Sequence, residues 1–206
     1  KNTEFHDLPL RVIDACSAYD MFVYIVTLCV GTTMENRMNH WRDDPRVETQ
    51  AIFNDNRLKL GVFGTNGGGI ALTKVQEASE VSWGAAIRAG VRADRFGFEA
   101  LVPFARWKGY VEEDPKHRSG VAYDCYTWAA GHGQATNYAG VFSTSHVPTM
   151  HPLLAAKQCT TIDHITGGRF GLNVVAGWNR PELEMFGVPM CEHDVRYDQA
   201  DEWLQL

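Results

Sequence analysis

The chain has 206 residues, a formal charge of −6, and 45% hydrophobic and 11% aromatic residues. This length and composition are typical of one substantial globular domain and exclude a disordered chain. The sequence contains no basic block that could neutralise phosphates, so nucleic acids and membrane surfaces are disfavoured as partners.

The cysteines argue against a disulfide framework and against a metal site. They are odd in number, widely spaced and form no CxxC pair: Cys16, Cys29, Cys125, Cys159 and Cys191. We therefore expect no bound metal and a reducing, cytoplasmic environment. The most apolar run, residues 21–30, is shorter than the roughly 20 residues of a membrane helix. Acidic residues precede this run where a signal peptide would be basic, so we expect no targeting segment.

The first part of the chain differs in character from the rest. Residues 1–50 show weak periodicity and end in a charged, polar stretch, which is typical of an N-terminal extension or linker that need not be native to the domain. From residue 51 the pattern becomes regular. We therefore predict that residues 51–206 form the folded domain.

Strands and helices are predicted to alternate along this domain. Short β-rich or apolar runs indicate strands, while capping residues, helical spacing of apolar side chains and terminating glycines indicate helices. The predicted strands are residues 58–62, 98–102, 136–144 and 169–175. Helices are predicted to begin at Ser82, Tyr123, Pro152 and near Arg196, and the second is expected to end before Gly131 and Gly133.

Four such βα units predict an α/β fold with a parallel sheet. A complete (β/α)8 TIM barrel has eight strands and about 250 residues. The chain is therefore expected to form an incomplete half barrel of about four units. Both edges of an open sheet would be unpaired, so we expect self-association of the isolated chain.

Three successive segments resemble one known family. Residues 151–157, 160–170 and 173–182 resemble the bacterial-luciferase-like flavin-dependent monooxygenases, in the branch that holds pyrimidine, nitrilotriacetate, dimethyl-sulfide and alkanesulfonate monooxygenases. The resemblance implies the N-terminal half of such an enzyme, with reduced FMN as cofactor, O2 as co-substrate and a small organic substrate. It also implies a separate flavin reductase and a homodimer. A deazaflavin (F420)-dependent hydride-transfer enzyme of the same superfamily and an inactive fragment remain as alternatives.

The resemblance also implies roles for individual residues of the site. Asn173 and Glu182 match flavin-contacting positions of the branch, and Arg196 with Tyr197 matches an Arg-Tyr pair at a helix start that suits the FMN phosphate. Each has a structural alternative. Asn173 could close a strand, Glu182 could stabilise the first turn of a helix, and the Arg-Tyr pair could lie on a solvated helix face.

Two further positions follow predicted strands. Pro103 and Phe104 occupy a flavin-contacting place after the second strand, although the family usually has an Ile-Lys type of sequence there. Phe104 could equally be a wall of the core or of the substrate pocket. His146, just past the third strand, is the candidate hydrogen-bond donor or proton shuttle. The other histidines singled out, His132, His151 and His164, are expected to be structural.

Overall fold

The computed structural model describes residues 24–26, 50–68, 81–109, 111, 114 and 116–206. Five strands form one sheet in the order β1-β5-β4-β3-β2. Their bounds are Tyr24–Val26 (β1), Gly61–Phe63 (β2), Ala100–Val102 (β3), Gly140–His146 (β4) and Phe170–Val175 (β5). Strands β2 to β5 are parallel to one another, whereas β1 runs antiparallel to β5.

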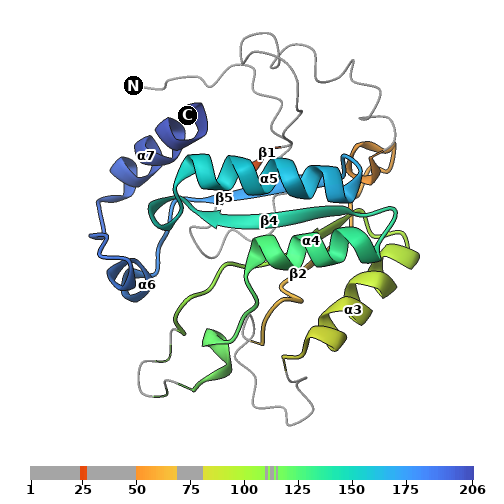
Figure 1. Ribbon diagram of the computed structural model, residues 1–206, viewed down its shortest axis with the longest axis horizontal. Coiled ribbons are helices and arrows are strands. Elements are labelled where there is room, and N and C mark those ends of the chain that lie inside the picture. Colours follow the sequence, from red (N-terminus) through yellow and green to blue (C-terminus); the bar gives the residue numbers. More distant parts are fainter. Residues whose placement is uncertain (1–23, 27–49, 69–80, 110, 112–113, 115) are drawn as a thin grey trace.

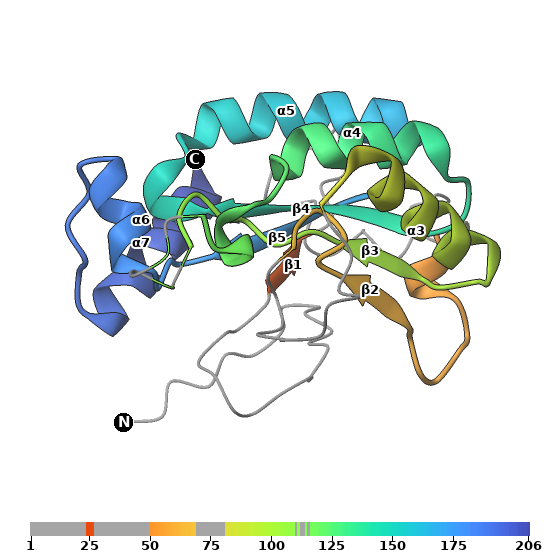
Figure 2. The ribbon, with the colours of Figure 1, turned by 90° about the horizontal axis from the view of Figure 1, so that it is seen from below.

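Three helices cover one face of this sheet, and two more lie at the end of β4 and β5 (Figures 1 and 2). The covering helices are Trp83–Arg95 (α3), Cys125–Ala135 (α4) and Pro152–Thr166 (α5), and the others are Arg180–Met185 (α6) and His193–Gln205 (α7). Three 3-10 turns span Ala51–Phe53 (η2), Arg118–Gly120 (η3) and Val147–Thr149 (η4). The predicted α/β architecture of four parallel βα units is confirmed.

The helix boundaries follow from local capping chemistry. The Ser82 side chain accepts from the Ala85 N–H, and the Asp124 side chain accepts from the Thr127 N–H, so each satisfies a donor that the helix itself leaves unpaired. Helix α5 ends at Gly167, whose φ of +66° lies in the left-handed region that favours glycine. These boundaries agree with the predicted helix starts to within a few residues.

Side chains along each strand point alternately to the two faces of the sheet, so only every second one packs against the helices. Leu101, Val141, Leu172 and Val174 are buried in the core beneath the helices. Because successive strand residues point to opposite faces, Asn173 lies on the other face, away from the helices. Every residue of β4 and β5 is buried, so both faces of these two strands are covered.

Two predictions about the fold were wrong. Helix α4 does not stop before Gly131 and Gly133 but continues to Ala135. A Cβ at Gly131 would clash with the Trp83 ring, and one at Gly133 would clash with Thr166, so these glycines allow close helix packing. The β5 edge of the sheet is also not open, because β1 pairs with it through residues 24–26, inside the region assigned to an extension.

The last helix also starts earlier than predicted. Helix α7 begins at His193, and the Trp203 indole N–H donates to the Met150 carbonyl at 2.7 Å. Ala200 is buried in the core, and Leu204 packs against it together with Trp203. The predicted apolar side of this segment therefore holds α7 against the turn that follows β4.

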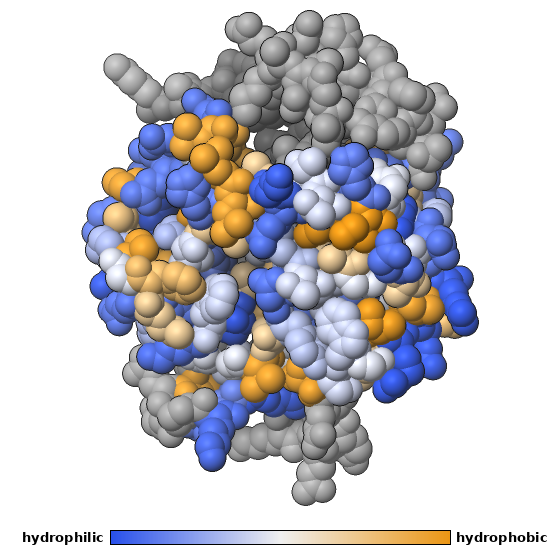
Figure 3. Space-filling view, in the orientation of Figure 1, coloured by the Kyte–Doolittle hydropathy of each residue, from blue (hydrophilic) through white to orange (hydrophobic). Residues whose placement is uncertain are grey.

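The outer surface carries apolar side chains in separate patches. Figure 3 shows them scattered among hydrophilic regions on one face. Leu153 and Leu154 near the start of α5 are among the exposed large apolar residues. No described helix has the length and apolarity needed to cross a membrane.

Replacing Gly171 with Ala should strongly destabilise the sheet. An added Cβ would meet the Phe142 ring of the neighbouring strand, with the ring Cζ only 2.7 Å away and other ring atoms closer. Such overpacking costs about 1–3 kcal/mol or more. Chemical denaturation should show this loss, whereas Gly84→Ala, which meets only the flexible end of Arg88, should not reduce stability. Equal stability of the two variants would contradict the prediction.

Candidate functional site

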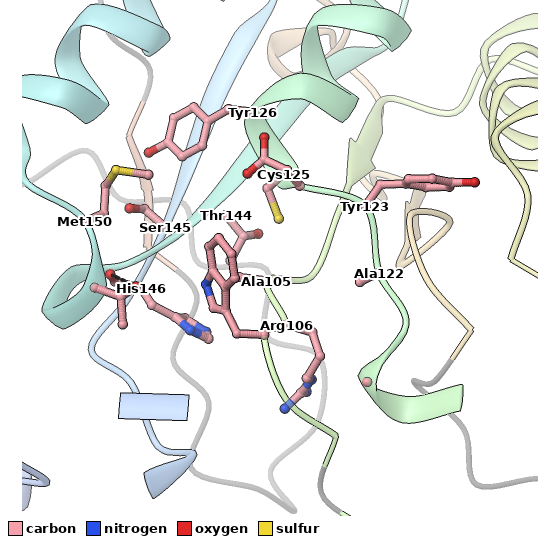
Figure 4. A pocket seen from close by; sticks show the side chains of 14 residues that line it. Ala105, Arg106, Ala122, Tyr123, Cys125, Tyr126, Thr144, Ser145, His146 and Met150 are labelled. Carbon is pink, nitrogen blue, oxygen red and sulfur yellow. Dashed lines mark hydrogen bonds between the residues drawn. The ribbon is translucent and has the colours of Figure 1, made fainter. Parts of the chain in front are cut away.

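A pocket opens where the C-terminal ends of the parallel strands meet (Figure 4). Its volume is about 210 Å³, and it is lined mainly by residues 105–107 after β3, residues 144–146 at the end of β4, and residues 122–126 at the start of α4. Small-molecule sites typically enclose about 300–1,000 Å³. The pocket is therefore smaller than a complete cofactor site, and it lies at the edge where barrel enzymes carry their active sites.

Asn66 fixes the backbone that follows β3. Its buried amide donates to the carbonyls of Phe104 at 2.7 Å and Tyr123 at 3.1 Å, and its Oδ1 accepts from the Phe104 N–H at 3.0 Å. One side chain thus joins the loops after β2 and β3 to the start of α4. Asn66 was not among the predicted site residues, because no local sequence pattern indicates contacts of this kind.

Glu182 is fully buried on α6, where it holds the same loop from the other side. Its Oε1 accepts from the backbone N–H groups of Trp107 at 2.8 Å and Lys108 at 3.1 Å. The Arg106 guanidinium lies 3.7 Å from this oxygen. The other carboxylate oxygen, Oε2, makes no hydrogen bond.

His146 faces this carboxylate from the end of β4. Its Nδ1 lies 3.6 Å from Glu182 Oε2, and neither atom has a hydrogen-bond partner. Burial lowers the pKa of His146; the Glu182 carboxylate opposes this effect and the Arg106 guanidinium adds to it, so the pKa is lowered overall. The lowered pKa favours the neutral imidazole of His146 at neutral pH, and His146 lines the pocket.

Asn173 connects the last two strands. Its amide donates to the Thr144 hydroxyl at 3.1 Å, and this hydroxyl donates to the Pro103 carbonyl at 2.5 Å. Asn173 Oδ1 is buried and has no hydrogen-bond partner. The chain of contacts places Asn173 and Pro103 on either side of Thr144, which lines the pocket.

The Arg-Tyr pair of α7 lies outside the pocket lining. Arg196 donates to the Gly177 carbonyl, and the Tyr197 ring lies 4.7 Å from the His193 ring. The structure thus brings His146 and Glu182 into direct contact and links Asn173 to Pro103. It places Arg196 and Tyr197 on the neighbouring helix with contacts of their own.

Several aromatic rings lie close to Arg106 and Trp107, two residues of the pocket lining. Trp107 packs edge-on against Phe186 at 5.1 Å, and the Arg106 guanidinium lies over the Trp178 ring at 5.2 Å and over the Phe104 ring at 5.7 Å. Trp107 is 49% exposed, whereas Phe104 is only 6% exposed. Of the two, Trp107 lines the pocket and is accessible, whereas Phe104 is buried against Phe63 and is not part of the pocket lining.

Two buried groups in the pocket lining, the Cys125 thiol and the Tyr126 hydroxyl, are uncharged. Burial raises the pKa of the Cys125 thiol to about 12 and also raises the pKa of the Tyr126 hydroxyl. Both groups keep their protons at neutral pH. In the described part of the chain no group of three or more His, Cys, Asp or Glu residues is arranged to hold a metal ion.

The histidines outside the pocket have structural contacts. His132 is fully buried, and its two ring nitrogens lie 3.0 Å from the Trp128 carbonyl and 3.1 Å from the Ala86 carbonyl. His151 caps α5 by accepting from the Leu153 N–H at 3.2 Å, and His164 is exposed. His132 and His151 thus have contacts within the fold, and the structural role expected of His164 stays a prediction.

Comparison with known proteins identifies the family. The family model described as luciferase-like monooxygenase matches residues 59–206. The chain therefore belongs to the luciferase-like monooxygenase family, as the resemblance of residues 151–182 predicted.

The relatives are enzymes of greater length. The pyrimidine monooxygenase RutA of Enterobacter sp. (strain 638) is 30% identical over 154 residues, which are 72% of this chain and 41% of the relative. The FMNH(2)-dependent dimethylsulfone monooxygenase of Pseudomonas putida is 31% identical over 138 residues, which are 67% of this chain and 36% of the relative. The chain thus spans about two-fifths of the length of these relatives.

Solved structures show the same fold. The EDTA monooxygenase of Chelativorans sp. BNC1 matches with a TM-score of 0.62 at 23% identity, over 73% of this chain and 36% of that protein. A long-chain alkane monooxygenase, LadA, matches with a TM-score of 0.63 at 21% identity, over 74% of this chain and 38% of that protein. These likenesses support the barrel-type α/β fold.

Proposed function

We propose that this chain supplies part of the reduced-FMN site of a flavin-dependent monooxygenase, which oxygenates a small organic substrate with O2. The observation that carries the proposal is the set of polar side chains at the C-terminal ends of β3 to β5, in a chain of the luciferase-like monooxygenase family. Reduced flavin supplied by a separate reductase, and a homodimeric enzyme, belong to the same proposal.

The residues present fit a flavin. Asn173 Oδ1 is a buried acceptor without a partner, which is rare in native proteins and is explained if a bound group donates to it. Trp107 provides accessible aromatic surface in the pocket lining, as binding of an isoalloxazine ring requires. Bound reduced flavin would supply the electrons that activate O2. The chain's own task is to orient that ring and to exclude water from it.

The assignment of individual residues is also a proposal. Asn173 and the backbone at Pro103 and Phe104 are proposed to meet the flavin ring, and His146 to exchange a proton at the pocket wall. Arg196 and Tyr197 are proposed to meet the phosphate. The Arg196 contact with the Gly177 carbonyl would then have to open when the phosphate binds.

The test is cofactor binding under anaerobic conditions. The chain should melt at a higher temperature with reduced FMN than alone, because a ligand that binds only the native state stabilises it by mass action. Asn173→Leu should remove most of this shift, whereas the exposed Asn137→Leu should not. A shift with reduced deazaflavin in place of FMN would favour the hydride-transfer alternative. No shift with either cofactor would indicate a chain without a working site.

A further inference from the structure

We propose that Glu182 is a positioning residue, which fixes the His146 imidazole with Nδ1 turned towards α6 and Nε2 left for the pocket. This role acts through His146 and goes beyond the direct flavin contact that the resemblance implies for Glu182. It rests on the proposed function only in giving His146 a ligand to act upon.

The atoms of Glu182 and His146 that face each other have no hydrogen-bond partner. Glu182 Oε2 and His146 Nδ1 lie 3.6 Å apart, both are buried, and neither makes a hydrogen bond. This separation exceeds a normal hydrogen bond, so the interaction is electrostatic. A carboxylate facing Nδ1 favours the tautomer that carries hydrogen on that nitrogen, which leaves Nε2 as a proton acceptor.

The carboxylate itself is held in place by the backbone. Because Oε1 accepts from the N–H groups of Trp107 and Lys108, the carboxylate cannot rotate away from His146 without losing both bonds. The Asn179 amide also donates to the Lys108 carbonyl at 3.2 Å, so α6 and the loop after β3 are joined twice. The orientation of the histidine is therefore tied to the loop that forms one wall of the pocket.

Arg106 balances the charge of the pair. Its guanidinium lies 3.7 Å from Glu182 Oε1 and is only 11% exposed. Among the described residues, the charged groups that act on His146 are Glu182 on α6 and Arg106 on the loop after β3. With the carboxylate already neutralised by Arg106, protonation of His146 is not needed for charge balance, and the imidazole can remain neutral.

Titration of His146 by NMR in the flavin-free chain tests this proposal. Glu182→Gln keeps a side-chain oxygen for the two backbone N–H groups but removes the charge. The pKa of His146 should fall by about one unit or more, a tenfold loss of proton affinity, since an opposite charge at this distance shifts a pKa by roughly 1–3 units. The 15N chemical shifts of the His146 ring should also show a weaker preference for hydrogen on Nδ1. Arg106→Met should change the pKa in the opposite direction.

Glu184→Gln is the matched control, because Glu184 lies exposed on the same helix. It should leave the His146 titration unchanged. If the Glu182→Gln chain folds and His146 keeps its wild-type pKa and tautomer, Glu182 only stabilises the loop after β3. That result would overturn the proposal. If Glu182→Gln does not fold, the tautomer of His146 in the wild-type chain decides, and hydrogen on Nε2 instead of Nδ1 overturns the proposal. The titration needs no flavin, so a failure to bind FMN would leave its result valid.

Discussion

Replacing Arg169 with Met should lower the free energy of unfolding by about 3 kcal/mol, because several partly buried acceptors lose a charged donor at once and each unsatisfied buried acceptor costs about 1–3 kcal/mol. The guanidinium donates to four carbonyls and one hydroxyl, which lie in residues 133–139 and at the end of α5. Its partners are the carbonyls of Gly133, Thr136, Ala139 and Thr166 and the hydroxyl of Thr136. Methionine fills a similar volume but leaves these acceptors without a donor.

The comparison that isolates this effect uses two further variants. Arg92→Met, on the exposed side of α3, should cost little, because a solvated arginine makes small contributions. Arg169→Lys should retain the charge but still lose stability, since an ammonium group cannot reproduce the planar fork of donors. Chemical denaturation of the three variants measures the differences. A loss for Arg169→Met no larger than that for Arg92→Met would refute the proposed role of the network.

Replacing Asn66 with Ala should destabilise the chain by about 2–4 kcal/mol, since two carbonyls and one N–H lose their partner in a buried position. The same change should loosen the loop that carries Phe104. We therefore expect amide hydrogen exchange of residues 104–108 to accelerate more than that of the β4 strand, in addition to the global loss.

Asn137→Ala provides the reference for this second experiment. Asn137 is exposed, and only its backbone N–H is engaged, by Asp94 at 3.2 Å. Its side chain can therefore be removed with little effect on stability. Exchange rates in the loop and in β4 that rise by the same factor in Asn66→Ala would show that Asn66 stabilises the fold without specifically ordering the pocket wall.

The sequence predicted the elements of the fold better than their ends. Ser82 and Pro152 mark helix starts by local chemistry, so both positions agree with the structure. Gly131 and Gly133 were misread because their role depends on a neighbouring helix, against which a side chain would not fit. The pairing of β1 was missed because three residues carry too little periodicity to identify a strand.

In the candidate site, too, local sequence patterns predicted some residues, whereas roles that depend on distant contacts were missed. His146 was predicted just past a strand and is the last residue of β4, which extends two residues further than predicted. It could be placed because parallel strands bring such residues to one edge of the sheet. The roles of Asn66 and Arg106 depend on contacts across 38 to 76 positions of the chain, such as Asn66 with Phe104 and Arg106 with Glu182. No local pattern encodes contacts of that kind. Glu182 was singled out by resemblance, but its contacts with backbone N–H groups and with His146 became visible only in the structure.

The antiparallel strand β1 occupies the edge of β5 at which a closed barrel would add its next strand. A strand has two edges, and β5 already shares one of them with β4. The backbone groups of residues 172–174 on the remaining edge face β1. A closed barrel would require a parallel strand at this position. Tyr24–Val26 would therefore have to be displaced before β5 could accept such a neighbour.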